Sequence, residues 1–155
     1  MAGNDARRWP RLYPPVVFLI GIAAMWGLRR LWPGLTHDWW PWNLAGIAPI
    51  AASLAGIVTA ARQFGRIGTT VVPFRTPTAL ETRGLYRFTR NPIYLGLATA
   101  LTGVAILMAN LAAFAVIPLF VAWITLGFII PEERALEQEF GETYRAYKAR
   151  VRRWL

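Results

Sequence analysis

Two clusters of polar residues combine side chains that could bind a charged small molecule. The first comes just before an apolar segment and contains arginine, asparagine and tyrosine side chains, namely Tyr86, Arg87, Arg90, Asn91 and Tyr94. The second follows the next apolar segment and contains the pair Glu132-Glu133. Guanidinium groups beside a helix N-terminus favour a carboxylate or phosphate, whereas carboxylates favour a cation. Charged groups beside membrane-length apolar segments are costly unless they bind something.

The elements that position these clusters are long apolar segments. The chain has 155 residues, of which 55% are hydrophobic and 16% are charged. About 20 apolar residues in a helix cross a bilayer core. We therefore predict one all-α integral membrane domain over residues 1–155, with transmembrane helices at about 14–32, 43–62, 92–109 and 111–130. The last two form a tight hairpin, because little more than Asn110 separates them.

The net charge of +9 could indicate nucleic-acid binding, but its distribution favours a membrane topology. Lysine and arginine lie before the first segment, between the second and third, and after the fourth, whereas residues 31–61 contain none. The positive-inside rule then predicts that both termini are cytoplasmic. Arg29-Arg30 makes a poor cleavage region, so we expect no removed signal peptide. With no cysteine and only His37 as histidine, we expect no metal site, and no motif predicts nucleic-acid binding.

Two cytoplasmic parts accompany the helices. A loop over residues 62–91 is interrupted by glycine and proline, and connectors of this length are usually functional. After Pro131, apolar residues recur at steps of three or four and predict an amphipathic helix over 131–155, bent near Gly141. That helix could lie on the membrane surface or form a lid across the mouth of the bundle. The sequence pattern allows both.

The predicted topology brings the two polar clusters to one mouth of the hairpin. Each cluster also has a simpler interpretation: Asn91-Pro92 can begin a helix, and Glu132-Glu133 can complement a helix dipole. Neighbouring cationic and anionic subsites nevertheless suit a zwitterion that carries an additional positive charge. S-adenosylmethionine, with its carboxylate, ammonium and sulfonium groups, has this charge pattern.

Four stretches of residues 64–155 resemble the isoprenylcysteine carboxyl methyltransferase and phospholipid methyltransferase superfamily. They are PTAL at 77–80, GLYRFTRNPIYLG at 84–96, EERAL at 132–136 and FGETYRAY at 140–147. The resemblance implies a bacterial inner-membrane enzyme that transfers a methyl group from S-adenosylmethionine to a lipophilic acceptor. It implies cofactor contacts from Thr78, Ala79, Leu80, Glu81, Tyr86, Arg90, Asn91, Pro92, Ile93, Tyr94, Glu132 and Glu133, and catalytic roles for Arg90, Glu132 and Glu133.

Two positions depart from the isoprenylcysteine branch of that superfamily. Asn91 stands where that branch usually has histidine, and Phe128 stands where it has an arginine for the substrate carboxylate. The acceptor therefore stays open between an isoprenylcysteine-like carboxylate and a phospholipid amine. Two rival interpretations are an NADPH-dependent membrane reductase of sterol-reductase-like architecture and a non-catalytic membrane scaffold. The sequence indicates no oligomeric state.

Overall fold

The computed structural model describes residues 13–66 and 80–155, with side chains up to residue 63 in the first range. Its helices are α1 (Pro14–Leu31), α2 (Ile47–Arg66), α3 (Pro92–Met108), α4 (Val116–Ile124) and α5 (Ile130–Arg150). The described residues contain no strand, only an isolated bridge between Thr36 and Asn110. The predicted all-α class is confirmed for this part of the chain. The predicted contacts of Thr78 and Ala79, and residues 67–79 of the 62–91 loop, lie outside the described residues.

Three described helical stretches are long and apolar enough to cross a membrane, at Pro14–Leu31, Trp42–Gln63 and Leu111–Arg150. The helix α3, with 17 residues, is a shorter apolar helix. Leucines on the outside of the bundle are widely exposed, with Leu54 at 63% and Leu119 at 69%. A large apolar outer surface fits a protein embedded in lipid. The number of spans and their orientation stay predictions.

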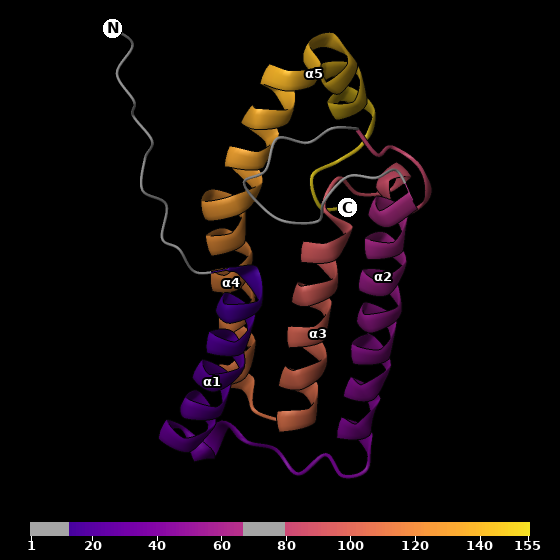
Figure 1. The fold of residues 1–155 in the computed structure, drawn as a ribbon. Helices are drawn as coiled ribbons and strands as arrows, with labels where there is room; N and C mark the ends of the chain where they lie inside the picture. The colour runs from indigo at the N-terminus through magenta and orange to yellow at the C-terminus, as the bar shows by residue number, and fades with distance from the viewer. Residues whose placement is uncertain (1–12, 67–79) are drawn as a thin grey trace, which may run out of the picture.

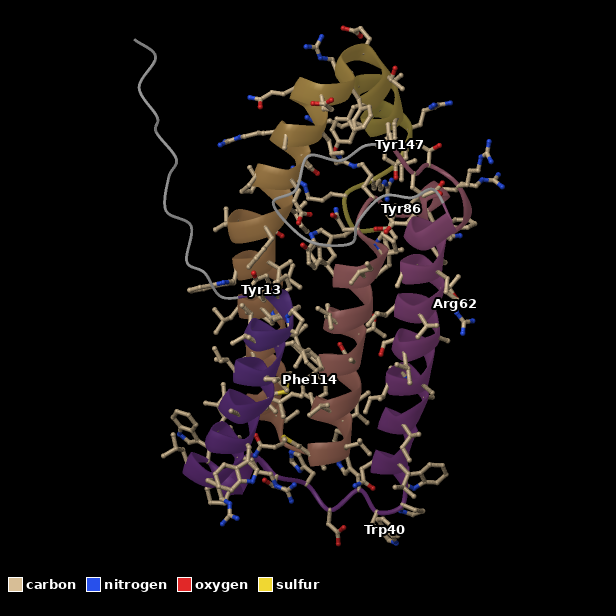
Figure 2. The ribbon with its side chains drawn as sticks, in the orientation of Figure 1. Tyr13, Trp40, Arg62, Tyr86, Phe114 and Tyr147 are labelled. Atoms are coloured by element: carbon tan, nitrogen blue, oxygen red, sulfur yellow. The ribbon has the colours of Figure 1, made fainter. Side chains whose placement is uncertain are left out.

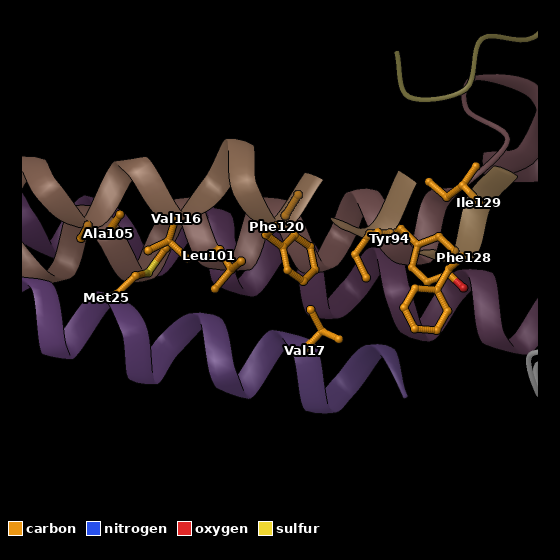
Figure 3. Close-up of a cluster of buried hydrophobic side chains, with 12 residues drawn as sticks. Val17, Met25, Tyr94, Leu101, Ala105, Val116, Phe120, Phe128 and Ile129 are labelled. Atoms are coloured by element: carbon orange, nitrogen blue, oxygen red, sulfur yellow. The ribbon is translucent and has the colours of Figure 1, made fainter. Parts of the chain in front are cut away.

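The helix α3 lies between α2 on one side and the pair α1 and α4 on the other (Figure 1). Its small residues allow a close approach to α2. A Cβ atom built on Gly103 would lie 2.5 Å from the carbonyl oxygen of Gly46, and one built on Gly96 would lie 2.6 Å from Cγ1 of Ile57. On the opposite side, Leu101 and Tyr94 join Val17, Phe120 and Phe128 in the buried core (Figure 3).

The hairpin between α3 and α4 is fixed by a buried asparagine. Asn110 is fully buried, and its Nδ2 donates to the Trp32 carbonyl at 3.1 Å and to Thr36 Oγ1 at 2.8 Å. Its Oδ1 accepts the backbone N–H of Ala113 at 3.3 Å, which caps the 3₁₀ turn Leu111–Ala115. The same side chain therefore closes the hairpin and ties it to the connection after α1.

A continuous helical path runs from α4 through a π-helical turn, Thr125–Ile129, into α5. The backbone at Gly141 leaves the helical region (φ 51°, ψ −123°), so that the last part of α5 turns back, and the predicted bend is confirmed. The helix ends at Arg150, because Val151 is extended, although the apolar spacing continues to Leu155. Residues 151–155 instead return toward the start of α3, where the C-terminus lies (Figure 1).

The contact between α2 and α3 predicts a specific sensitivity to volume. We expect Gly103→Ala to destabilise the protein by about 1–3 kcal/mol, because the added methyl group meets backbone that cannot move alone. Thermal unfolding in detergent micelles measures this effect. The control is Gly56→Ala in α2, whose Cβ would meet nothing within 4 Å. Equal melting temperatures for the two variants would contradict the close packing.

Candidate functional site

The two predicted polar clusters meet at one end of the bundle, which we call the mouth: the start of α3, the start of α5 and the chain end. The Tyr94 hydroxyl donates to Glu132 Oε1 at 2.7 Å. Arg90 Nη1 lies 3.0 Å from Glu133 Oε1, and both side chains are only 8% exposed. The predicted proximity of the clusters is therefore confirmed as direct contact.

Glu133 is held by two arginines. Arg153 approaches it with two parallel hydrogen bonds, from Nε to Oε1 at 2.9 Å and from Nη2 to Oε2 at 2.7 Å. Together with Arg90, this gives two guanidinium groups around one buried carboxylate, which leaves the trio with a charge of about +1. Burying a carboxylate is costly unless cations and hydrogen bonds compensate it. The charge of the buried Glu133 carboxylate is therefore balanced by arginine side chains of the protein itself.

The sequence did not single out Arg153, although the structure places it at the centre of the site. It belongs to a basic run at the chain end, and nothing in the residue spacing separates it from its neighbours. The backbone beside it is also engaged. The carbonyl of Arg152 accepts the N–H of Arg90 at 3.0 Å, and the carbonyl of Arg153 accepts Nδ2 of Asn91 at 3.0 Å and Oγ1–H of Thr89 at 3.2 Å.

This arrangement changes the role of Asn91. The residue stands at the N-cap position of α3, and Pro92 begins the helix as predicted, but the Asn91 side chain makes no capping hydrogen bond. It donates instead to the chain end. The N–H groups of Ile93 and Tyr94 have no intrahelical acceptor, because they belong to the first turn. The start of α3 therefore keeps backbone donors and the positive end of its dipole for an anion.

Trp154 anchors the chain end in the bundle. Its indole Nε1 donates to Thr125 Oγ1 at 3.3 Å, inside the π-helical turn, and its ring packs against the apolar core. The Thr125 hydroxyl in turn donates to the Val121 carbonyl at 2.6 Å. π-helical turns often lie at functional sites. Here the turn provides the contact that positions the chain end.

Glu132 has a different environment from its neighbour. It lies just beyond the apolar stretch that ends at Ile130, and burial raises the pKa of its carboxyl to about 7, against a smaller lowering by the hydrogen bond from Tyr94. Phe128, only 2% exposed, packs near Tyr94 with the ring centroids 6.4 Å apart. The raised pKa of the Glu132 carboxyl therefore lies near neutral pH. The carboxyl is hydrogen-bonded to Tyr94, whose ring packs near Phe128.

The last part of α5 covers the mouth through two buried tyrosines. Tyr147 donates its hydroxyl to the Tyr86 carbonyl at 2.7 Å, and Arg90 Nη1 donates to the Tyr144 hydroxyl at 3.3 Å. Figure 2 shows Tyr86 and Tyr147 at the same end of the molecule, far from Trp40. Burial raises the pKa of Tyr86 and of Tyr147, so both phenols stay protonated. These contacts favour the lid interpretation of the C-terminal helix.

The remaining predicted residues lie around this centre. Pro92 is buried, whereas Leu80, Glu81 and Ile93 are partly buried. Glu81 Oε1 accepts the N–H of Arg83 at 2.7 Å, just before the 3₁₀ turn Gly84–Arg87 that carries Tyr86. One donor in the site is left over: Nε of Arg90 is buried and has no hydrogen-bond partner. Such a group is costly unless a ligand satisfies it.

The compensation of Glu133 predicts a stability difference between two glutamates. Glu133→Gln should lower the free energy of unfolding by about 3 kcal/mol, because it leaves two arginines without their buried counter-ion. Thermal unfolding in detergent measures the loss. Glu137→Gln is the matched control, since Glu137 also contacts two basic side chains, but at the surface. A melting temperature that falls equally in both variants would contradict the importance of burial.

The chain is similar to a known protein family and to several of its members. Residues 42–143 match the phospholipid methyltransferase family. The chain is 34% identical over 128 residues to protein-S-isoprenylcysteine O-methyltransferase A of Arabidopsis thaliana, covering 78% of this chain and 62% of that protein. It is 33% identical over 145 residues to the B protein of the same plant, covering 88% and 70%. The predicted superfamily resemblance is confirmed.

A bacterial relative is named for a different methyl-transfer reaction. Over 76 residues the chain is 40% identical to methanethiol S-methyltransferase 1 of Bradyrhizobium diazoefficiens, covering 49% of this chain and 26% of that protein. The chain thus spans less than two thirds of the length of both this protein and the plant A protein. No solved structure matches the chain.

Proposed function

The chain belongs to the phospholipid methyltransferase family, and we propose that it is a membrane enzyme that methylates a lipophilic acceptor with S-adenosylmethionine. We further propose four spans, with the mouth and both termini on the cytoplasmic side of a bacterial inner membrane. The observation that carries the proposal is the presence of two unlike charged groups at one mouth: the net-positive trio Arg90, Glu133 and Arg153, and the separate acid Glu132, which is hydrogen-bonded to Tyr94.

The residues at the mouth fit the charges of the cofactor. The unpartnered Arg90 Nε–H and the first-turn N–H groups of α3 suit a carboxylate. Glu132 suits the ammonium group, and the buried rings of Tyr86 and Tyr94 are the aromatic groups at the mouth that would contact a cation or a purine ring. The catalytic roles first predicted for both glutamates can thus be divided. Glu132 would contact the ligand, whereas Glu133, already paired with two arginines, would hold Arg90 in place.

When bound, the cofactor supplies a methyl group on a positively charged sulfur. The protein's part is to orient the acceptor in line with that methyl group and to exclude water. Phe128, Ile129 and Tyr94 belong to the buried apolar core next to the mouth, and a lipophilic acceptor would approach from this bundle side.

The first test of this proposal is cofactor binding. We expect purified protein in detergent to bind S-adenosylhomocysteine by calorimetry, and Glu132→Gln to weaken that binding about tenfold, which corresponds to about 1.4 kcal/mol. Glu137→Gln, on the outer surface of α5, should leave the affinity unchanged. No binding at millimolar ligand would refute the proposal, and binding of NADPH instead would favour a membrane reductase.

Binding should also depend on pH through Glu132. Because burial raises the pKa of this carboxyl to about 7, its anionic form predominates only above that pH. Affinity for S-adenosylhomocysteine should therefore fall as the pH is lowered from 8 to 6, and the slope should be lost in Glu132→Gln. A calorimetric titration series measures this dependence. An identical pH profile in wild type and variant would assign the dependence to another group.

The acceptor needs an assay of its own. The two classes predicted from the resemblance, an isoprenylcysteine-like carboxylate and a phospholipid amine, can be separated by labelled methyl transfer to each type of lipid. Phe128 argues against the carboxylate class, because it offers no charge to hold an anionic acceptor. Label recovered in phospholipid would support an amine acceptor, whereas a base-labile methyl ester would support a carboxylate.

A further inference from the structure

The chain end, residues 151–155, enters the mouth and contacts three elements of the site. We propose that it is a permanent wall of the cofactor site and that Arg153 is a positioning residue, which holds Glu133, Arg90 and Asn91 in their binding arrangement. This inference rests on the proposed function, since it concerns the same cofactor. It assigns a role to residues outside the segment that matches the family, which ends at residue 143.

Arg153 fixes the plane of the Glu133 carboxylate. Its Nε and Nη2 atoms each contact a different carboxylate oxygen, at 2.9 and 2.7 Å. A two-point contact of this kind allows little rotation of the carboxylate. Oε1 of the same carboxylate lies 3.0 Å from Arg90 Nη1. The orientation that Arg153 imposes on Glu133 therefore also determines the position of Arg90. With Nη1 held by Glu133 and Tyr144, the Nε–H of Arg90 is left without a protein acceptor.

The backbone of the chain end prepares the start of α3. The Arg153 carbonyl draws the Asn91 side chain away from the first turn, which therefore has no side-chain cap. The Arg152 carbonyl accepts the Arg90 N–H and so fixes the residue that precedes the N-cap Asn91. Two sets of donors, the first-turn N–H groups and Arg90 Nε, are thereby kept free for one anionic group. We identify that group as the carboxylate of the cofactor.

The contacts of Trp154 indicate that the chain end is a permanent part of the site and does not leave it when the cofactor binds. Its ring packs on the core, and its N–H bonds to Thr125, so withdrawal of the chain end would expose apolar surface and break this hydrogen bond. The chain end also leaves the Arg90 Nε–H unused, whereas a segment that mimicked the ligand would satisfy it. We therefore expect the chain end to stay in place when the cofactor binds.

The experiment compares two neighbouring arginines in the full-length protein. Arg153→Met should raise the Kd for S-adenosylhomocysteine at least tenfold by calorimetry, and Arg153→Lys should recover part of the loss, because lysine restores the charge without the two-point contact. Arg152→Met is the matched control: it removes the same charge from an exposed side chain and keeps the backbone carbonyl, so its Kd should stay within twofold of wild type. Hydrogen exchange of the backbone amides of residues 151–155 provides a second readout, and bound S-adenosylhomocysteine should slow this exchange in wild type.

Several outcomes would overturn the inference. If wild type binds and Arg153→Met binds within twofold as well, even with a lower melting temperature, Arg153 has a structural role only. If Arg153→Met binds more tightly, or if ligand speeds the hydrogen exchange of residues 151–155, the segment competes with the cofactor. If Arg153→Met does not fold, an Arg153→Lys variant with wild-type affinity is equally contrary. Failure of wild type itself to bind would instead refute the proposed function.

Discussion

The arrangement of the mouth depends on the burial of one carboxylate. Glu133 is 8% exposed at the edge of an apolar bundle, where an uncompensated charge would be prohibitively costly. Its partners come from distant parts of the sequence: Arg90 before α3 and Arg153 after α5. Satisfying this charge therefore requires that the α3 start, the α5 start and the chain end meet. The turn at Gly141 and the extended backbone at Val151 allow the chain end to reach this position.

The environments of the two adjacent glutamates differ because they lie on different sides of one helix. Glu133 faces the arginines, whereas Glu132 faces Tyr94, close to Phe128. One is fully compensated, and the other has a carboxyl whose pKa is raised to about 7 by burial. A pair of identical residues thus provides a rigid support and a group that can respond to a ligand. This division is the physical basis of the roles that we propose for them.

Much of the fold and part of the site could be predicted from the sequence. Apolar segments of membrane length located the helices, and Pro92 marked the start of α3. The short link at Asn110 required a hairpin, and the hairpin brought Arg90 close to the glutamate pair. The return of the chain end could not be predicted in this way. Val151 and Leu155 continue the helical spacing, and tertiary contacts of Arg152, Arg153 and Trp154 hold the chain end at the mouth.

A structure of the protein with S-adenosylhomocysteine, determined by crystallography or electron microscopy, would test the central claim most directly. We expect the ligand carboxylate within hydrogen-bonding distance of Arg90 Nε, its ammonium group beside Glu132, and Arg153 still paired with Glu133. A ligand bound away from the start of α3, or bound with residues 151–155 displaced from the mouth, would contradict this expectation.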